Sequence, residues 1–96
     1  MNAVLNYING KWVTPDASEF IDVIDPATGE LLARTPICNA DDVGEAVRAA
    51  SNAFPTWRNT PAQERIQHLF TLRGFMRTHM DEIARTITRE CGKPLD

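Results

Sequence analysis

Two cysteines and two histidines have the greatest capacity for chemistry in this chain of 96 residues. Cys38 falls where a predicted strand gives way to a predicted helix, a setting that can activate a thiol, but no base is identifiable beside it. Cys91 lies at a predicted helix exit, where free carbonyls do not stabilise a thiolate. His68 and His79 have no second His or Cys at metal-ligand spacing. We therefore predict that these side chains are structural and that the chain holds no catalytic residue.

The glycines do not form a nucleotide-binding loop. Such a loop clusters glycines between a strand and a helix, so that backbone N–H groups can reach the phosphates. The five glycines of this chain are scattered, at Gly10, Gly29, Gly44, Gly74 and Gly92. We therefore predict no cofactor-binding residue here.

The distribution of charge argues against a nucleic-acid partner. The formal net charge is −3, with eight acids and three bases in residues 1–48 and five acids and seven bases in residues 49–96. In the second half Arg77, Asp81 and Arg85 recur every four residues with mixed sign, as on a solvated helix face. A surface that binds polyanions needs a denser basic cluster.

Signals for membranes and secretion are missing from the sequence. No run approaches the ~20 apolar residues that span a bilayer, and the first residues lack a charged region followed by an apolar one. Two cysteines are too few for the disulfide framework of a small secreted protein. We therefore predict a cytoplasmic protein with no membrane partner.

Short antiparallel strands are predicted over about residues 5–35, within a hairpin region at 1–37. Asn9-Gly10 between two apolar runs is a strong hairpin signal, because both residues must adopt positive φ. A β-branched run follows at 20–24. The segment 25–29 (DPATG) predicts a turn in which Asp bonds to the backbone two residues on and Gly supplies positive φ.

Two or three helices are predicted over about residues 40–54 and 61–91, within a helical region at 38–96. Asn39 supplies the first N-cap, and Pro55 is expected to end that helix. Thr60 with Gln63 predicts a capping box for the next helix.

The second helical stretch is about 30 residues long and is predicted to bend. We expect a break or bend at Gly74 together with the Thr78-His79 stretch, and an end at Gly92, where glycine favours the left-handed cap conformation. A chain of this length buries somewhat more than ~60% of its unfolded surface, which is enough for a modest core.

Four segments in this order resemble the N-terminal part of the NAD(P)-dependent aldehyde dehydrogenase superfamily. They are residues 7–12 (YINGKW), 25–30 (DPATGE), 49–57 (AASNAFPTW) and 90–94 (ECGKP). Each is weak alone, but the four together in register are specific. The resemblance covers about residues 7–96 and implies a three-layer α/β parent fold, in which residues 1–96 form the N-terminal segment of the cofactor-binding domain.

The resemblance also implies an activity. Members of the family oxidise an aldehyde or semialdehyde to an acid or acyl-CoA through a nucleophilic cysteine, with hydride passing to NAD or NADP. Neither Cys38 nor Cys91 matches the motif of that cysteine. We therefore expect the reactive residues to lie beyond Asp96, the 96 residues alone to be inactive, and the stop at Asp96 to be a truncation boundary. A small aldehyde substrate and a homo-oligomer are implied as well.

A structural site for Na⁺ or K⁺ is the one site that the resemblance carries onto these residues. Its ligands are two successive backbone carbonyls before the Asp-Pro turn and an acid before the Gly-Lys-Pro motif. In this chain these positions are Val23, Ile24 and Glu90. Oxygen donors of this kind suit a hard cation.

Two questions stay open at this point. Segments 69–72 and 87–93 are similar to the branch that acts on methylmalonate semialdehyde, against a general or semialdehyde-oxidising member, and the acyl acceptor is either water or coenzyme A. An alternative from another functional class is that the chain is a short non-enzymatic helical interaction module. In either case the exposed helix faces predict that the isolated segment associates. These faces are built from Phe54, Phe70, Phe75 and Ile83.

Overall fold

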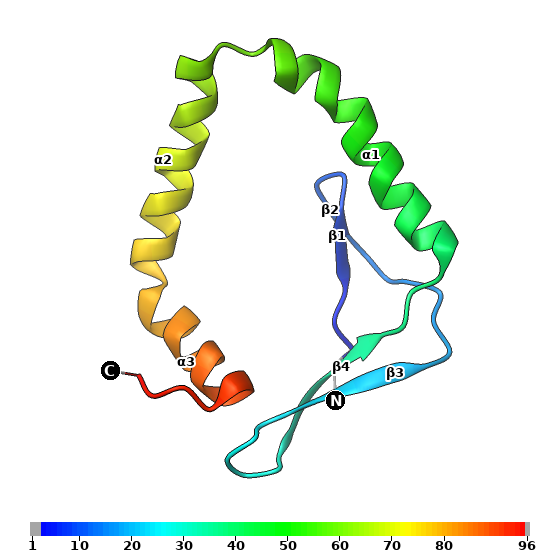
Figure 1. The fold of residues 1–96 in the computed structure, drawn as a ribbon, viewed down its shortest axis with the longest axis vertical. Coiled ribbons are helices and arrows are strands. Elements are labelled where there is room, and N and C mark those ends of the chain that lie inside the picture. The colour runs from blue at the N-terminus through cyan, green and yellow to red at the C-terminus, as the bar shows by residue number, and fades with distance from the viewer. Residues whose placement is uncertain (1–2, 96) are drawn as a thin grey trace.

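The computed structural model describes residues 3–95, which form an open arch (Figure 1). The elements in chain order are β1 (Asn6–Ile8), β2 (Lys11–Val13), β3 (Phe20–Ile24), β4 (Leu31–Pro36), α1 (Ala40–Asn59), α2 (Ala62–Thr78) and α3 (Met80–Cys91). In Figure 1, α1 forms one arm and α2 with α3 forms the other, while β1 and β2 lie beside α1 and the β3–β4 hairpin lies at the base. The predicted order of short antiparallel strands followed by helices is confirmed.

The first hairpin forms around the predicted Asn-Gly turn. Asn9 and Gly10 have φ of 53° and 75°, the positive values that a two-residue hairpin loop requires. The strands pair in the register Asn6 with Val13, so that Tyr7 lies opposite Trp12. The rings of this cross-strand pair have centroids 4.9 Å apart.

The second hairpin is closed by the predicted turn at 25–29. The Ala27 N–H donates to Oδ1 of Asp25 at 2.8 Å, and the Gly29 N–H donates to the Asp25 carbonyl at 2.8 Å. Gly29 has φ of 76°. β3 and β4 then pair as a separate two-stranded sheet, so the strands form two hairpins and not one sheet.

The start of α1 follows the prediction, and its end does not. The Asn39 side chain accepts from the Asp42 N–H at 2.9 Å, while the Asn39 N–H donates to the Asp42 carboxylate at 3.1 Å, a reciprocal capping box. The predicted end at Phe54 is wrong, because α1 continues through Pro55 to Asn59. Trp57 lies on the same helix face as Phe54, and its ring stands 5.7 Å from that of His68. We attribute the continued helix to this contact.

The predicted capping box at the start of α2 is also wrong. Pro61 occupies the N-cap position and no side chain caps the helix. The Thr60 hydroxyl instead donates to the Thr56 carbonyl at 2.8 Å, and the Thr60 N–H donates to the Trp57 carbonyl at 3.2 Å. Thr60 is therefore used to close α1 and is not available to open α2.

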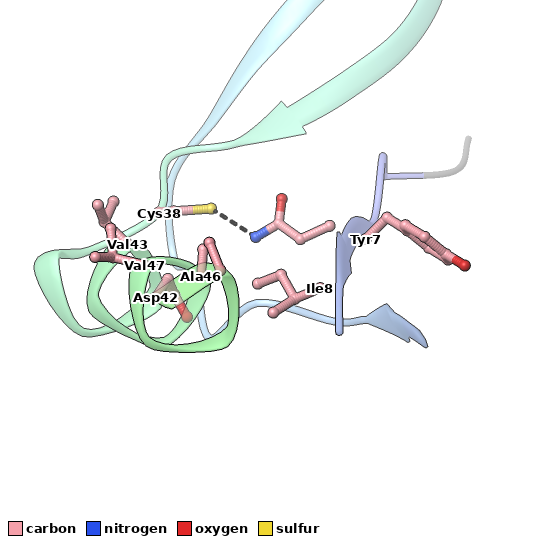
Figure 2. A pocket seen from close by; sticks show the side chains of 9 residues that line it. Tyr7, Ile8, Cys38, Asp42, Val43, Ala46 and Val47 are labelled. Carbon is pink, nitrogen blue, oxygen red and sulfur yellow. Dashed lines mark hydrogen bonds between the residues drawn. The ribbon is translucent and has the colours of Figure 1, made fainter. Parts of the chain in front are cut away.

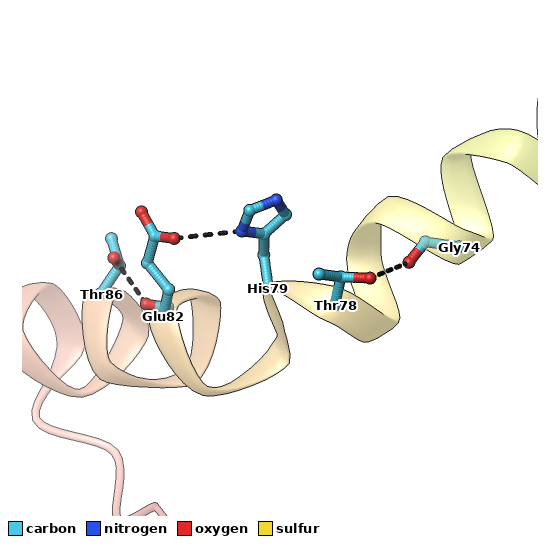
Figure 3. Close-up of polar contacts among 5 residues, drawn as sticks. All are labelled: Gly74, Thr78, His79, Glu82 and Thr86. Atoms are coloured by element: carbon cyan, nitrogen blue, oxygen red, sulfur yellow. Dashed lines mark hydrogen bonds and ion pairs between the residues drawn. The ribbon is translucent and has the colours of Figure 1, made fainter.

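The helical stretch breaks at Thr78-His79, within the region predicted for a break, and not at Gly74. α2 ends at Thr78, α3 begins at Met80, and Gly74 lies inside α2. His79 between them has φ of −104° and ψ of 18°. Figure 3 shows the polar contacts at the break: Thr78 donates to the Gly74 carbonyl at 3.0 Å, and His79 Nδ1 lies 3.3 Å from Glu82 Oε2.

The apolar side chains of this arch are only partly covered. Within residues 3–95 Pro36 is the only buried residue, and none of the large hydrophobic side chains is buried. The predicted modest core is therefore wrong. Stable domains pack one layer of structure against another, whereas here each hairpin has only two strands and the helices follow one another around the arch. None of the helices in this range has the length and apolarity that crossing a bilayer requires.

Candidate functional site

The predicted carbonyl ligands lie at the end of β3, opposite an irregularity in β4. Val23 pairs with Ala33 and Ile24 pairs with Leu31, so that the register shifts between Val23 and Ile24. Successive carbonyls of a regular antiparallel strand point to opposite sides and cannot both ligate one ion. The pairing passes over Leu32, so the extra residue of this irregularity lies on β4, opposite the step between the two residues that the prediction names.

The predicted carboxylate ligand lies at the end of α3. Glu90 is exposed and precedes Gly92 by two residues. Gly92 has φ of 73° in the left-handed region, and its N–H donates to the Thr88 carbonyl at 2.8 Å. The end of α3 meets the β3–β4 turn here, since a Cβ placed at Gly92 would lie 3.4 Å from Cγ of Pro26. This contact joins Gly92 and Pro26, which lie two residues from Glu90 and Ile24, and not the predicted ligands themselves.

The chemistry of these donors favours an alkali cation over a transition metal. Residues 3–95 contain no group of three or more His, Cys, Asp or Glu side chains that could hold a metal ion. The predicted site offers two neutral carbonyls and one carboxylate, the hard oxygen ligands that suit cations without directional bonding. Cation binding by Val23, Ile24 and Glu90 stays a prediction.

Cys38 lines a hollow between the first hairpin and α1 (Figure 2). The hollow has a volume of about 510 Å³, and most of its lining is apolar. The lining residues are Asn6, Tyr7, Ile8, Cys38, Asp42, Val43, Ala46, Val47 and Ala50. The Asn6 amide donates to Cys38 Sγ at 3.3 Å, and the thiol approaches the Pro36 carbonyl at 3.8 Å.

The surroundings of Cys38 support a structural thiol. Asp42 is the one carboxylate that lines the hollow, and it already accepts the Asn39 N–H in the capping box. A nucleophilic cysteine needs a base within hydrogen-bond reach, and none stands there. Sequence reasoning missed Asn6 as the partner of Cys38, because no local signal connects residues so far apart in the chain.

The other reactive side chains also have structural surroundings. Cys91 is the exposed last residue of α3, and both cysteines are free thiols. His68 stands against Trp57, and His79 pairs with Glu82 across one turn of α3. None of these contacts joins a nucleophile to a base and an orienting group, which is the arrangement that covalent catalysis requires.

Comparison with known proteins shows the family to which the chain belongs. The profile described as "Aldehyde dehydrogenase family" matches residues 12–96, and the chain therefore belongs to the aldehyde dehydrogenase family. Malonate-semialdehyde dehydrogenase 1 of Geobacillus kaustophilus is 42% identical over 88 residues, which are 92% of this chain and 18% of that protein. The mitochondrial acylating methylmalonate-semialdehyde dehydrogenase of Arabidopsis thaliana is 42% identical over 92 residues, which are 96% of this chain and 15% of that protein.

Solved structures contain the same arch. An aldehyde dehydrogenase from Bartonella henselae matches with a TM-score of 0.94 and 33% identity, over 100% of this chain and 20% of that one. PnpE, solved in complex with nicotinamide adenine dinucleotide, matches with a TM-score of 0.88 and 36% identity, over 99% of this chain and 19% of that one. The chain thus spans about a fifth of the length of the proteins it matches, and its fold is a segment of an α/β enzyme fold.

Proposed function

We propose that this chain is the N-terminal segment of an NAD(P)-dependent aldehyde dehydrogenase, and that the whole enzyme oxidises a semialdehyde of the malonate or methylmalonate type. The observation that carries the proposal is 42% identity to enzymes named for these two substrates, over 92% and 96% of the chain. The product is an acid, or an acyl-CoA if coenzyme A accepts the acyl group. The word "acylating" in the name of the Arabidopsis relative keeps the second outcome open.

The cofactor proposal concerns the whole enzyme and not this segment. NAD or NADP, when bound, supplies the acceptor for the hydride that leaves the aldehyde carbon. PnpE holds the dinucleotide, which supports NAD for the present enzyme. The residues of this chain do not fit the group themselves, because their glycines are scattered and do not form the cluster that a phosphate-binding loop needs. We therefore propose that both cofactor and catalytic residues belong to other parts of the fold, and that this segment packs within the cofactor-binding domain.

A chimera tests whether this chain can serve as the N-terminal segment of such an enzyme. Residues 1–96 replace the matching segment of the Geobacillus kaustophilus enzyme, and NADH formation is followed with malonate semialdehyde or methylmalonate semialdehyde, with and without coenzyme A. We expect NADH formation by the chimera, and neither NADH formation nor NAD⁺ binding by the 96-residue chain alone. Tight NAD⁺ binding by the chain alone would place the cofactor site here and overturn the assignment.

We further propose that Val23, Ile24 and Glu90 bind Na⁺ or K⁺. The approach of Gly92 to Pro26 supports this, because it brings the end of α3 to the turn that follows β3. Replacing Na⁺ and K⁺ by tetramethylammonium should lower the melting temperature of the chimera, and Glu90→Gln should remove that dependence. Glu45→Gln, which removes an exposed carboxylate on α1, is the matched control. An equal ion dependence in the Glu90→Gln and Glu45→Gln variants would count against the site.

We also propose that the chain by itself forms a dimer or higher oligomer. Exposed apolar faces on all three helices support this, since apolar surface of this extent favours association. Such association is also what a non-enzymatic interaction module would show. Light scattering at tens of micromolar tests it, and a clean monomer would contradict it. The proposed location is the cytoplasm, which the two free thiols support.

A further inference from the structure

Asn9 is the one asparagine of this chain that a glycine follows. The six asparagines are followed in turn by Ala3, Tyr7, Gly10, Ala40, Ala53 and Thr60. An asparagine can react with the next residue, because the backbone nitrogen of that residue can attack the side-chain amide carbon, Cγ. A Cβ on the attacking residue crowds this approach, whereas glycine has none and its backbone is free to rotate. The sequence therefore makes Asn9 the most reactive of the six.

The structure leaves the two reacting groups accessible at the tip of the first hairpin. Asn9 and Gly10 are both exposed. Apart from the neighbouring residues, no atom lies within 4 Å of the position that a Cβ of Gly10 would take. The strand pairing ends with Ile8 opposite Lys11, so the Gly10 N–H takes no part in it. A bond from this nitrogen to carbon therefore removes none of the hydrogen bonds that pair the strands.

The turn is one peptide rotation away from the geometry of the reaction. Positive φ at both Asn9 and Gly10 is the type I′ pattern, in which ψ of the first loop residue is about 30°. A bond between Gly10 N and Asn9 Cγ closes a five-membered ring, which holds ψ of Asn9 at a strongly negative value. The type II′ turn, the other common two-residue hairpin turn, has positive φ and a ψ of about −120° at this residue. Rotation of the peptide unit between Asn9 and Gly10 converts one turn into the other while the strands stay paired.

We propose that Asn9-Gly10 is a site of spontaneous modification that reacts within the folded hairpin. The Gly10 nitrogen forms the bond to Asn9 Cγ, and the side-chain amide nitrogen leaves as ammonia, which takes up the proton that Gly10 loses. The product is a cyclic imide, a succinimide. Water then adds to one of the two imide carbonyls and breaks the bond from that carbonyl to nitrogen. Addition at Cγ gives aspartate, and addition at the backbone carbonyl gives isoaspartate, in which the main chain runs through the former side chain.

The two products have different effects on the hairpin. Aspartate keeps the turn, because Asp-Gly also favours type I′, and it adds one negative charge. Isoaspartate adds one carbon to the backbone of the loop, so the loop no longer matches the register of Ile8 with Lys11. The strand β1 carries Asn6, whose amide donates to Cys38 Sγ at 3.3 Å. Isoaspartate at residue 9 should therefore loosen the cover of the half-buried Cys38.

The test ages the 96-residue chain and, separately, the folded chimera at mildly alkaline pH in water enriched in heavy oxygen. Peptide mapping by mass spectrometry should show a labelled oxygen in place of the amide nitrogen at residue 9. The reaction should be faster there than at Asn39 and Asn52, which are also exposed but precede alanine. Hydroxylamine, which cleaves succinimides, should cut both chains between residues 9 and 10. Gly10→Asp keeps a residue type that the type I′ turn accepts, adds a Cβ, and should abolish the reaction.

The rate of Cys38 alkylation is the second readout. The isoaspartate form should react faster at Cys38 than the fresh chain, whereas Asn9→Asp, which adds the charge without the extra backbone carbon, should react like the fresh chain.

Three results would overturn the proposed site. They are equal rates at Asn9, Asn39 and Asn52, modification of Asn9 only after unfolding in urea, and an unmodified Asn9 in the folded chimera. Equal Cys38 alkylation in the isoaspartate form and in Asn9→Asp would overturn the loosening of the hairpin.

Discussion

Replacing Gly92 by alanine should loosen the end of α3 at the place where it meets the β3–β4 turn. Gly92 has φ of 73° and caps the helix, with its N–H bonded to the Thr88 carbonyl at 2.8 Å. Its missing side chain also allows the close approach to Pro26, because an added Cβ would stand 3.4 Å from Cγ of that ring. The substitution therefore acts on conformation first and on packing second.

The expected cost follows from the backbone angle. A residue with a Cβ in the left-handed region costs about 1–2 kcal/mol, whereas contact at 3.4 Å is close to ordinary van der Waals distance and adds little. One to two kcal/mol changes a local opening equilibrium by a factor of about 5–30. Amide hydrogen exchange of the last turn of α3 should accelerate by that factor in the Gly92→Ala chain.

Gly44→Ala is the matched control with the opposite expected sign. Gly44 lies inside α1 with no atom near the position of a Cβ, and its φ is not positive. Alanine in a helix interior is more stable than glycine by about 0.5–1 kcal/mol, so exchange in α1 should slow. If Gly92→Ala left exchange in α3 unchanged or slowed it as Gly44→Ala does in α1, the argued cap and its contact with the turn would be wrong.

Three smaller predictions concern the other helix ends. Asn39→Ala should destabilise α1 by about 1 kcal/mol through loss of the capping box, measured as lower helicity by circular dichroism, and normal helicity would contradict the cap. Thr60→Ala should speed amide exchange only in the last turn of α1, because its hydroxyl bonds to the Thr56 carbonyl; an effect in the first turn of α2 would restore the rejected capping box. His79→Ala should change stability by less than about 0.5 kcal/mol, because the pair with Glu82 is exposed, and a larger loss in urea unfolding would refute this.

Local chemistry made much of the fold predictable. The Asn9-Gly10 hairpin, the turn at 25–29, the Asn39 cap and the Gly92 end each depend on a few neighbouring residues whose backbone or hydrogen-bonding preferences agree. The errors came where a tertiary contact or a competing bond decided the outcome. Pro55 did not end α1, which continues to Asn59 and places Trp57 beside His68, and Thr60 was already bonded to α1.

The candidate cation site rests on the family resemblance alone and stays a prediction. Nothing local to Val23 or Glu90 indicates that β3 and α3 end beside each other, since that depends on the path of the chain through three helices. The contact between Asn6 and Cys38 likewise depends on the path of the chain and has no local sequence signal. The missing core could not be read from composition either, because 43% hydrophobic residues are ordinary usage for a protein that buries them within itself.

The central claim is that this chain serves as a segment of an aldehyde dehydrogenase. The most direct measurement is the initial rate of NADH formation by the chimera with malonate semialdehyde, beside the parent Geobacillus enzyme. We predict a rate comparable to that of the parent. A folded chimera that forms no NADH, while the parent does so under the same conditions, would contradict the claim.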